Sequence, residues 1–368
     1  MRKKYIFMLK QLQIFFDFLR FCIGSAKDIP STLKDADWKA LYRIAQKQCL
    51  VGILFDGIQR LPSSDVGISR DLLLQWMAQS KMLEKANVRL NDAAIQVSEW
   101  FRKKGFRTCI LKGQGNALMY PNPYSRTPGD IDIWVEGGDK RVISFVRSIS
   151  PHEKACYHHI EFPSYKGVEV EVHYRPSFLL CFWHNRKLQK YYERVKEEQF
   201  SHRVMLGEQG VIAIPTVEFN LIFQLTHIFS HLMNEGIGLR QLLDYYYVLI
   251  SDDLLLIRDR VQKELKELGL WKFAGGIMYI MQEVFGMPAS RLIVPPDEKY
   301  GRFVLNEVLE AGNFGRHDER NRFGRSKLGH NLQRVYRDIR LVRDFPAEAL
   351  CEPIFRTWHF FWRMKNKK

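Results

Sequence analysis

The sequence predicts an α+β protein in which a small mixed β-sheet lies between two helical regions. Apolar side chains recur at helical spacing in residues 1–104, and the same spacing returns from about residue 185 onward. Between these stretches, short segments with alternating apolar and polar residues are separated by glycine and proline. We therefore expect three regions: a helical region at 1–104, a small α/β unit at 105–180 and a second helical region at 181–368.

The first region is expected to contain one long helix. Its apolar side chains form one broad face between Ser69 and Lys104, and Gly105 follows where a left-handed helix end would need glycine. An earlier helical segment opens at Asp37. Residues 5–21 are apolar but interrupted by charges, which predicts an amphipathic helix packed on this region rather than a signal peptide or a membrane span. Binding of 5–21 to a membrane surface is the alternative.

The middle region predicts the order strand, helix, strand, helix, strand, strand. Asp139 is expected at the N-cap of the second helix, and Lys166-Gly167 is expected to turn between the last two strands. This order is typical of a small α/β unit with a mixed sheet. The six expected elements are residues 107–113, 115–121, 130–138, 139–149, 155–165 and 167–176.

The third region is expected to be helical throughout. Its basic segment 316–343 holds nine Lys or Arg against three Asp or Glu, and an apolar stripe within it predicts an amphipathic helix. Four further helices are expected at 216–234, 238–250, 253–269 and 271–286.

The composition is that of a globular protein with an excess of basic residues. The hydrophobic fraction is 46% and the charged fraction 26%, so disorder is not expected. A net charge of +15 attracts anions such as a triphosphate, RNA, DNA or anionic lipid, although a solvated basic surface without such a partner explains it equally well. The six cysteines are scattered without metal-binding spacing, which favours reduced thiols in a cytoplasmic protein.

Asp130 and Asp132 stand two residues apart on a predicted strand. Side chains at this spacing project to the same face, so both carboxylates point together while Ile131 and Ile133 turn to the other face. Two like charges with Cα atoms about 6–7 Å apart are costly unless a cation lies between them. Magnesium suits such a pair, because it binds one or two carboxylates together with substrate phosphates and water. An isolated Asp-x-Asp pair is nevertheless more often a solvated strand end.

A second strand offers further carboxylates. Glu169, Glu171 and His173 alternate on one face of it, with valines turned to the opposite face. A third carboxylate beside the aspartate pair completes the ligand set that two-metal phosphoryl chemistry needs. Alternation alone does not decide between Glu169 and Glu171, since both project to the same face.

Lys112-Gly113-Gln114 joins the first strand to the first short helix. Glycine at such a junction lets backbone N–H groups approach a phosphate, and Lys112 would add positive charge. Taken alone, a junction of this kind is usually only a turn.

Together these segments resemble the DNA polymerase β-type nucleotidyltransferase superfamily. More closely, they resemble the bacterial family of uncharacterised nucleotidyltransferases, with a Leu-Lys-Gly, a Tyr-Pro, an Arg, an Asp-h-Asp-h and a Glu/Asp-h-His, where h is a hydrophobic residue. The resemblance covers about residues 107–176 and continues more weakly over 227–244. It is carried by LKGQGNALMY at 111–120, RTPGDIDIWV at 126–135 and VEVEVHYRP at 168–176.

The resemblance implies that the middle region is a minimal nucleotidyltransferase palm, which transfers a nucleoside monophosphate from an NTP to an acceptor hydroxyl and releases pyrophosphate. Asp130, Asp132 and Glu171 would bind two Mg²⁺ ions, for which Mn²⁺ could substitute. Glu171 is preferred because it stands two residues before the histidine of the family pattern. Gly113 and Gln114 would occupy the place of the Gly-Ser nucleotide-binding turn, and glutamine in place of serine puts a hydroxyl contact to phosphate in doubt.

The resemblance also implies further nucleotide-binding residues. Lys112 would contact phosphate, and a longer loop than usual would carry Arg126 to the triphosphate. His173 would orient the carboxylate or contact the substrate, although a structural histidine is an equal alternative. Arg240 would face the nucleotide from the helical region, where it could also pair with Asp244 four residues later.

Other histidines are expected to play smaller parts. His227 and His231 have a spacing that zinc sites use, but no third ligand is evident, which favours a core or supporting role. At most one of His158 and His159 is expected to reach the site, because adjacent side chains on a strand point in opposite directions.

Several alternatives stay open from the sequence. The acceptor is a small molecule, a sugar, a tRNA or a protein, and the basic charge favours a polyanion modestly. A nucleotide- or RNA-binding protein without catalysis is the competing function. The base preference and the oligomeric state are not determined by the residue pattern.

Overall fold

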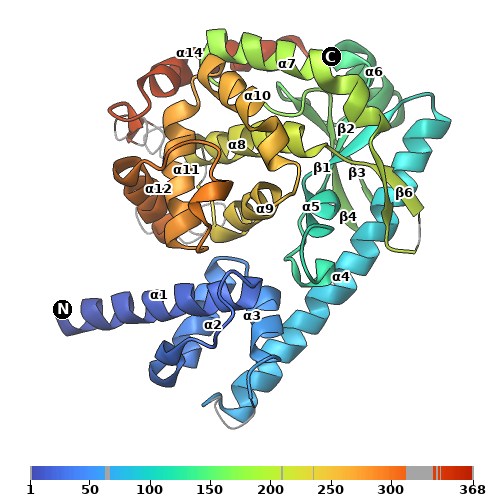
Figure 1. Cartoon of the computed structure of the whole chain (residues 1–368). Helices are drawn as coiled ribbons and strands as arrows, with labels where there is room; N and C mark the ends of the chain where they lie inside the picture. Colours follow the sequence, from blue (N-terminus) through green and yellow to red (C-terminus); the bar gives the residue numbers. More distant parts are fainter. Residues whose placement is uncertain are drawn as a thin grey trace.

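A small mixed sheet flanked in the chain by helices forms the centre of the computed structural model, which is shown in Figure 1. The model describes residues 2–62, 67–208, 210–234, 236–311, 335–336, 339 and 341–366. The α+β class and the order of the elements in the middle region agree with the prediction from sequence. The helices are α1 (Arg2–Ile23), η1 (Ser31–Asp35), α2 (Trp38–Lys47), α3 (Val51–Ile58), α4 (Arg70–Lys103), α5 (Gly113–Ala117), η2 (Pro123–Ser125), α6 (Gly138–Ile149), α7 (Phe182–Ser201), α8 (Val217–Asn234), α9 (Leu239–Leu249), α10 (Leu254–Glu267), α11 (Trp271–Glu283), η3 (Ala289–Arg291), α12 (Glu298–Ala311) and α14 (Pro346–Lys365). The strands are β1 (Thr108–Leu111), β2 (Ile131–Val135), β3 (His159–Tyr165), β4 (Val168–His173), β5 (Arg203–Leu206) and β6 (Gly210–Ala213).

The four-stranded sheet has the order β1-β2-β4-β3. Strand β2 runs parallel to β4, whereas β1 and β3 are antiparallel to their neighbours. In the parallel pair Asp132 lies opposite Glu171, and Trp134 lies opposite His173. The register therefore brings an acidic residue of each central strand to the same level of the sheet.

The two faces of the sheet contact different layers. Ile131, Ile133 and Val135 belong to the hydrophobic core that also contains residues of α4 and α6. On the opposite face Trp134 packs against Phe200 of α7 and Phe219 of α8, with ring centroids 4.6 and 5.8 Å apart. Because β2 alternates, Asp132 faces the same side as Trp134, toward the C-terminal helices.

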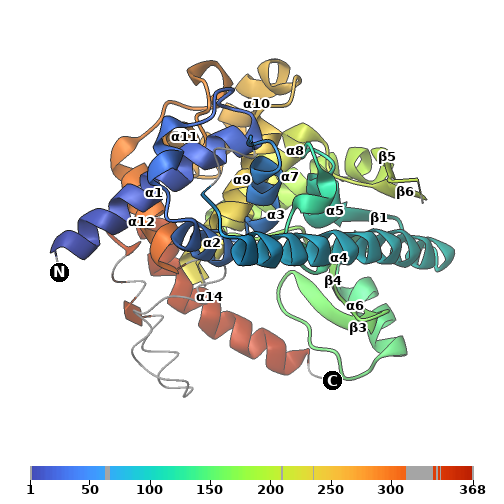
Figure 2. The same cartoon turned by 90° about the horizontal axis from the view of Figure 1, so that it is seen from below.

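Helix α4 runs from the N-terminal helices along the sheet and links the two (Figures 1 and 2). The Ser69 side chain accepts a hydrogen bond from Leu72 N–H at its start, and Gly105 follows its end with φ of +81°. Both ends agree with the prediction, since an N-cap oxygen satisfies a free N–H and glycine adopts a left-handed φ without a steric clash.

The N-terminal and C-terminal helices share one hydrophobic core. Its buried members include Phe15 and Phe18 of α1 as well as Phe273 of α11. Gln48, which is buried after α2, donates to Val308 O of α12 and accepts from Leu239 N–H of α9. Among the described residues no helix combines the length and the apolar character needed to cross a lipid bilayer.

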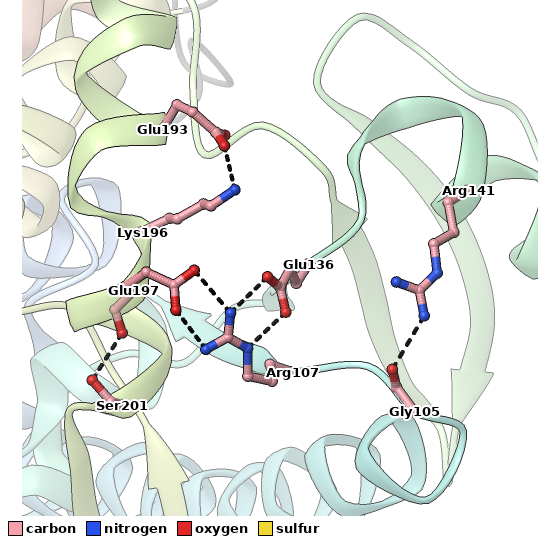
Figure 3. A network of polar contacts seen from close by, with 8 residues as sticks. All are labelled: Gly105, Arg107, Glu136, Arg141, Glu193, Lys196, Glu197 and Ser201. Atoms are coloured by element: carbon pink, nitrogen blue, oxygen red, sulfur yellow. Dashed lines mark hydrogen bonds and ion pairs between the residues drawn. The ribbon is translucent and has the colours of Figure 1, made fainter.

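An ion-pair network joins helix α7 to the edge of the sheet (Figure 3). The Arg107 guanidinium donates to Glu136 at 2.6 and 2.7 Å and to Glu197 of α7 at 2.8 and 2.9 Å. Arg107 precedes β1 and Glu136 follows β2, so one side chain links two strand ends and a helix. Bidentate geometry makes such a network more specific than an isolated surface pair.

Several details differ from the sequence prediction. Strands β5 and β6 form a hairpin where only helices were expected. Helix α5 begins at Gly113 rather than at Gly115, and Gly137 rather than Asp139 is the N-cap of α6. Most of the basic segment 316–343 lies outside the described residues, so the amphipathic helix expected there stays a prediction.

Phe101 tests the packing between α4 and the sheet. Its side chain is fully buried among the rings of four other aromatic residues. We expect Phe101→Ala to lower the free energy of unfolding by about 3–5 kcal/mol, because it removes a buried ring and leaves a cavity. Denaturant unfolding measures this, with Phe361→Ala as a control for a ring that is 63% exposed. Equal losses in both variants would show that this contact does not stabilise the fold.

Candidate active site

A cavity of about 530 Å³ lies between the sheet and the C-terminal helices. Among the residues named from sequence, Gln114 does not line it. Gln114 is 1% exposed, and its Nε2 has no hydrogen-bond partner among the residues that the structure describes. The sequence-predicted residues that do line the cavity are Lys112, Gly113, Arg126, Asp130, Asp132, Glu171, His173 and Arg240.

Three carboxylates meet in this cavity. One oxygen from each of Asp130, Asp132 and Glu171 lies within 4.8 Å of the other two. Asp132 and Glu171 come together because they are directly opposite in the β2–β4 register. Glu169 is exposed and is not part of the cavity lining. The structure therefore places Glu171, rather than Glu169, beside the aspartate pair.

The Asp132 carboxylate is buried between two cationic groups. It is 3% exposed, and its Oδ1 lies 2.9 Å from Lys112 Nζ and 2.9 Å from His173 Nε2. Burial opposes ionisation, but Lys112 and His173 outweigh it and hold the pKa of Asp132 well below its ordinary value. These two groups therefore keep a buried carboxylate ionised inside the cavity.

The pKa values of the other two carboxyl groups shift in opposite directions. The negative charge of Asp132, followed by burial, raises the pKa of Asp130 to about 6. Burial also disfavours the charged form of Glu171, but a hydrogen bond from His173 and the electrostatic attraction of His159 and His173 together outweigh it and lower the pKa of Glu171. Three negative charges whose oxygen atoms lie within 4.8 Å of one another are stable only if protons or cations compensate them.

The pKa values of three histidines around the carboxylates shift in different directions. Although burial favours the neutral form, hydrogen bonds to Asp132 and Glu171 raise the pKa of His173 to about 9. Burial lowers the pKa of His159 to about 4 and that of His158 well below its ordinary value. At neutral pH His173 is therefore charged while His158 and His159 are neutral.

The turn that carries Lys112 is conformationally unusual. Lys112 has φ of +52° and ψ of −136°, and Gly113 follows with φ of +41°. A side chain in this region costs about 1–3 kcal/mol relative to a relaxed backbone. The turn directs Lys112 Nζ toward Asp132 and to within 3.3 Å of His227 Nε2. The ion pair between the Lys112 ammonium group and the buried Asp132 carboxylate offsets this backbone strain.

Arg126 and Arg240 reach the cavity from the loop and from α9. The Arg126 guanidinium donates to Asp244 through Nε at 2.7 Å and Nη2 at 2.8 Å, and Tyr120 donates to the same carboxylate at 2.7 Å. Asp244 therefore pairs with Arg126 of the loop and not with Arg240, the partner that the helix spacing suggested. Arg240 donates to Thr127 O at 3.0 Å, and its buried Nε has no partner among the described residues.

Some lining residues were not expected from the sequence. Both His158 and His159 line the cavity, because His158 precedes β3 and strand alternation does not apply to it. Asn116 also lines the cavity and accepts a hydrogen bond from Gln224, but it belongs to no sequence motif that would mark it. Helix α14 adds Glu352, Phe355, Arg356 and His359 to the lining. Nothing in the local sequence pattern links α14 to this site.

Comparison with known proteins identifies the family. The model of a family described as uncharacterised nucleotidyltransferase matches residues 34–286, which is more than half of the chain. The chain therefore belongs to this family. No match is found among curated proteins.

A solved structure of an antigenic nucleotidyltransferase-like protein from Paracoccidioides brasiliensis is similar to part of the chain. It is 14% identical, with a TM-score of 0.28, and the alignment covers 49% of this chain and 90% of that one. A TM-score this low does not establish a shared fold.

His173 makes the stability of the metal-free protein depend on pH. Its pKa in the folded state, about 9, lies above the unfolded value near 6.5, so its ion pairs stabilise the fold fully below pH 6.5. This contribution is lost as the pH rises through 9. We expect the difference in unfolding free energy between wild type and His173→Gln to shrink between pH 6.5 and 9.5 in EDTA.

Chemical denaturation at each pH measures this difference. His152→Gln removes an exposed histidine and should track the wild type throughout. A difference between wild type and His173→Gln that stays constant with pH would contradict the charged state assigned to His173.

Proposed function

We propose that the protein transfers a nucleoside monophosphate from an NTP to an acceptor hydroxyl and releases pyrophosphate. The observation that carries the proposal is the meeting of Asp130, Asp132 and Glu171 in one cavity that also contains Lys112 and Arg240. Family membership supports a nucleotide substrate. The carboxylates supply metal ligands, and the two cations supply partners for a triphosphate.

The donor set fits magnesium. All three converging groups are carboxylates, and Mg²⁺ prefers oxygen ligands over the nitrogen and sulfur that zinc favours. When bound, two Mg²⁺ or Mn²⁺ ions held by Asp130, Asp132 and Glu171 would activate the acceptor hydroxyl and neutralise the triphosphate. Lys112 and His173 compensate the same negative charge in the metal-free site.

The transfer is a substitution at the α-phosphorus. The acceptor oxygen forms a bond to this phosphorus while the bond to the bridging oxygen of the β-phosphate breaks, and pyrophosphate leaves with that electron pair. Glu171 takes the proton of the acceptor hydroxyl. His159 Nδ1 lies 3.4 Å from the Glu171 carboxylate, but burial lowers the pKa of His159 to about 4, so this imidazole does not compete with Glu171 for the proton at pH 7.

The cations of the site divide into two kinds. Lys112 and Arg240 contact the triphosphate, and Lys112 would exchange Asp132 for a phosphate oxygen if a bound metal ion compensated the charge of that carboxylate. Arg126 positions the loop, since Nε and Nη2 already bond Asp244. A direct contact from Arg126 or Gln114 to phosphate stays a prediction.

Product formation tests the proposal directly. Each α-³²P-labelled NTP is incubated with the protein, Mg²⁺ and a cell extract that supplies the acceptor, and pyrophosphate and labelled products are measured. We expect one NTP to give both, and neither to form in EDTA. Equal signals from wild type and from the double variant Asp130→Asn, Asp132→Asn would overturn the proposed function.

Neighbouring glutamates on β4 provide a matched test of the third carboxylate. We expect Glu171→Gln to reduce pyrophosphate release by about 100-fold or more, because it removes a metal ligand and the proton acceptor. Glu169→Gln makes the same change two residues earlier at an exposed position and should retain activity within about 2-fold. If Glu169→Gln caused the larger loss, the assignment of the third ligand would be wrong.

A further inference from the structure

We propose that one face of helix α14 binds the acceptor, which is a small molecule carrying a hydroxyl group and an acidic group. The face consists of Glu352, Arg356 and His359, together with the ring of Phe355; we call it the α14 face. The proposal rests on the nucleotidyl transfer proposed above and specifies its second substrate.

The spacing of these residues puts them on one side of the helix. Glu352, Arg356 and His359 are separated by four and three residues, so their side chains follow one another along a single face. All three line the cavity that contains the carboxylates, as does Phe355. The helix therefore contributes three ionisable groups to a site for which the transfer chemistry gives them no role.

Each of the three side chains has a buried polar atom that finds no hydrogen-bond partner within the part of the chain that the structure describes. These atoms are Glu352 Oε2, Arg356 Nη1 and His359 Nε2. Glu352 is 5% exposed, and its Oε1 lies 3.8 Å from Arg356 Nε, too far for a hydrogen bond. A buried polar group without a partner costs about 1–3 kcal/mol. Three such atoms on one helix face indicate that a polar ligand completes them after small side-chain rotations.

A chain of contacts leads from the α14 face to the carboxylates. The ring of Phe355 stacks on Phe178 with centroids 5.1 Å apart, and Phe178 lies 4.9 Å from the ring of His158. The His158 ring is in turn 5.3 Å from that of His173, which bonds Asp132. A small molecule held by α14 could thus present a hydroxyl to the metal-binding carboxylates.

The chemistry of the face defines the ligand class. An arginine with a free nitrogen pairs with a carboxylate or a phosphate, and the Glu352 carboxylate accepts hydrogen bonds from hydroxyl or ammonium groups. The stacked rings of Phe178 and Phe355 provide a flat apolar wall for a sugar or another ring. A cavity of about 530 Å³ has the size of a small-molecule site.

The position of α14 in the chain agrees with a role in acceptor choice. The predicted metal and nucleotide ligands, from Lys112 to Arg240, lie within the family match at 34–286, whereas α14 spans Pro346–Lys365. Figure 2 shows α14 ending close to α6, and Arg147 of α6 donates a hydrogen bond to Asn366 O just after α14. This hydrogen bond joins the end of α14, which lies outside the family match, to α6, which lies inside it.

The test compares acceptor and nucleotide dependence in Glu352→Gln, Arg356→Ala and the control Lys365→Ala, which removes an exposed charge from the same helix. The acceptor source is the fraction of a cell extract below about 3 kDa, and labelled product is measured against its concentration and against NTP concentration. We expect Glu352→Gln and Arg356→Ala to raise the amount of fraction needed for half-maximal rate by about 10-fold or more, with the KM for NTP within about 2-fold. Lys365→Ala should match the wild type.

Each other outcome overturns a defined claim. A raised KM for NTP, or no change at all in either variant, would remove α14 from acceptor binding. Label formed with the unfractionated extract but not with the fraction below about 3 kDa would show a macromolecular acceptor instead. If wild type and Asp132→Asn label equally, the proposed transfer itself fails. Should Glu352→Gln not fold, Arg356→Ala alone decides.

A phosphatase-treated portion of the fraction distinguishes the two acidic groups. Loss of acceptor activity after treatment identifies a phosphate as the group that Arg356 binds, and retained activity identifies a carboxylate. If removal of Arg356 affects an acceptor without any acidic group equally, the role assigned to this guanidinium is wrong.

Discussion

The buried charge of Asp132 is the constraint on which the rest of the site depends. A carboxylate that is 3% exposed would be too costly to ionise without partners, so the fold supplies Lys112 and His173 at 2.9 Å each. Lys112 reaches Asp132 from a strained turn with positive φ. His173 reaches it because β4 lies parallel to β2 in a fixed register. The mixed topology of the sheet and its unusual turn thus serve one ionised group.

The negative charges of the three carboxylates are balanced by groups that a substrate can displace. In the metal-free site, protons and an ammonium group compensate the carboxylates, and Asp130, whose pKa is raised to about 6, is the carboxyl group that keeps a proton most readily. Metal ions would take over that compensation and release Lys112 toward phosphate. The cavity continues past neutral His158 to the α14 face, so the carboxylate cluster and the α14 face are separated by an uncharged aromatic surface.

Much of the candidate site was predictable because strands repeat every two residues. The projection of Asp130 and Asp132 to one face follows from alternation alone, and the register then selects Glu171 over Glu169, which alternation could not do. The partner of Asp244 was not predictable from helix spacing, since Arg126 lies 118 residues away in the chain. The α14 face was missed for the same reason, because an amphipathic helix does not reveal which cavity its polar residues enter. Hairpin β5–β6 was missed because its four-residue strands are short and lie between long helices.

The central claim is that the three carboxylates hold divalent cations together with a nucleotide. Titration of Mn²⁺ followed by electron paramagnetic resonance, with and without a non-hydrolysable NTP analogue, tests it most directly. We expect about two bound ions per chain in the presence of the analogue, and loss of this binding in Asp132→Asn but not in Glu169→Gln. Absence of bound Mn²⁺ in the wild type, or equal binding by Asp132→Asn, would contradict the account.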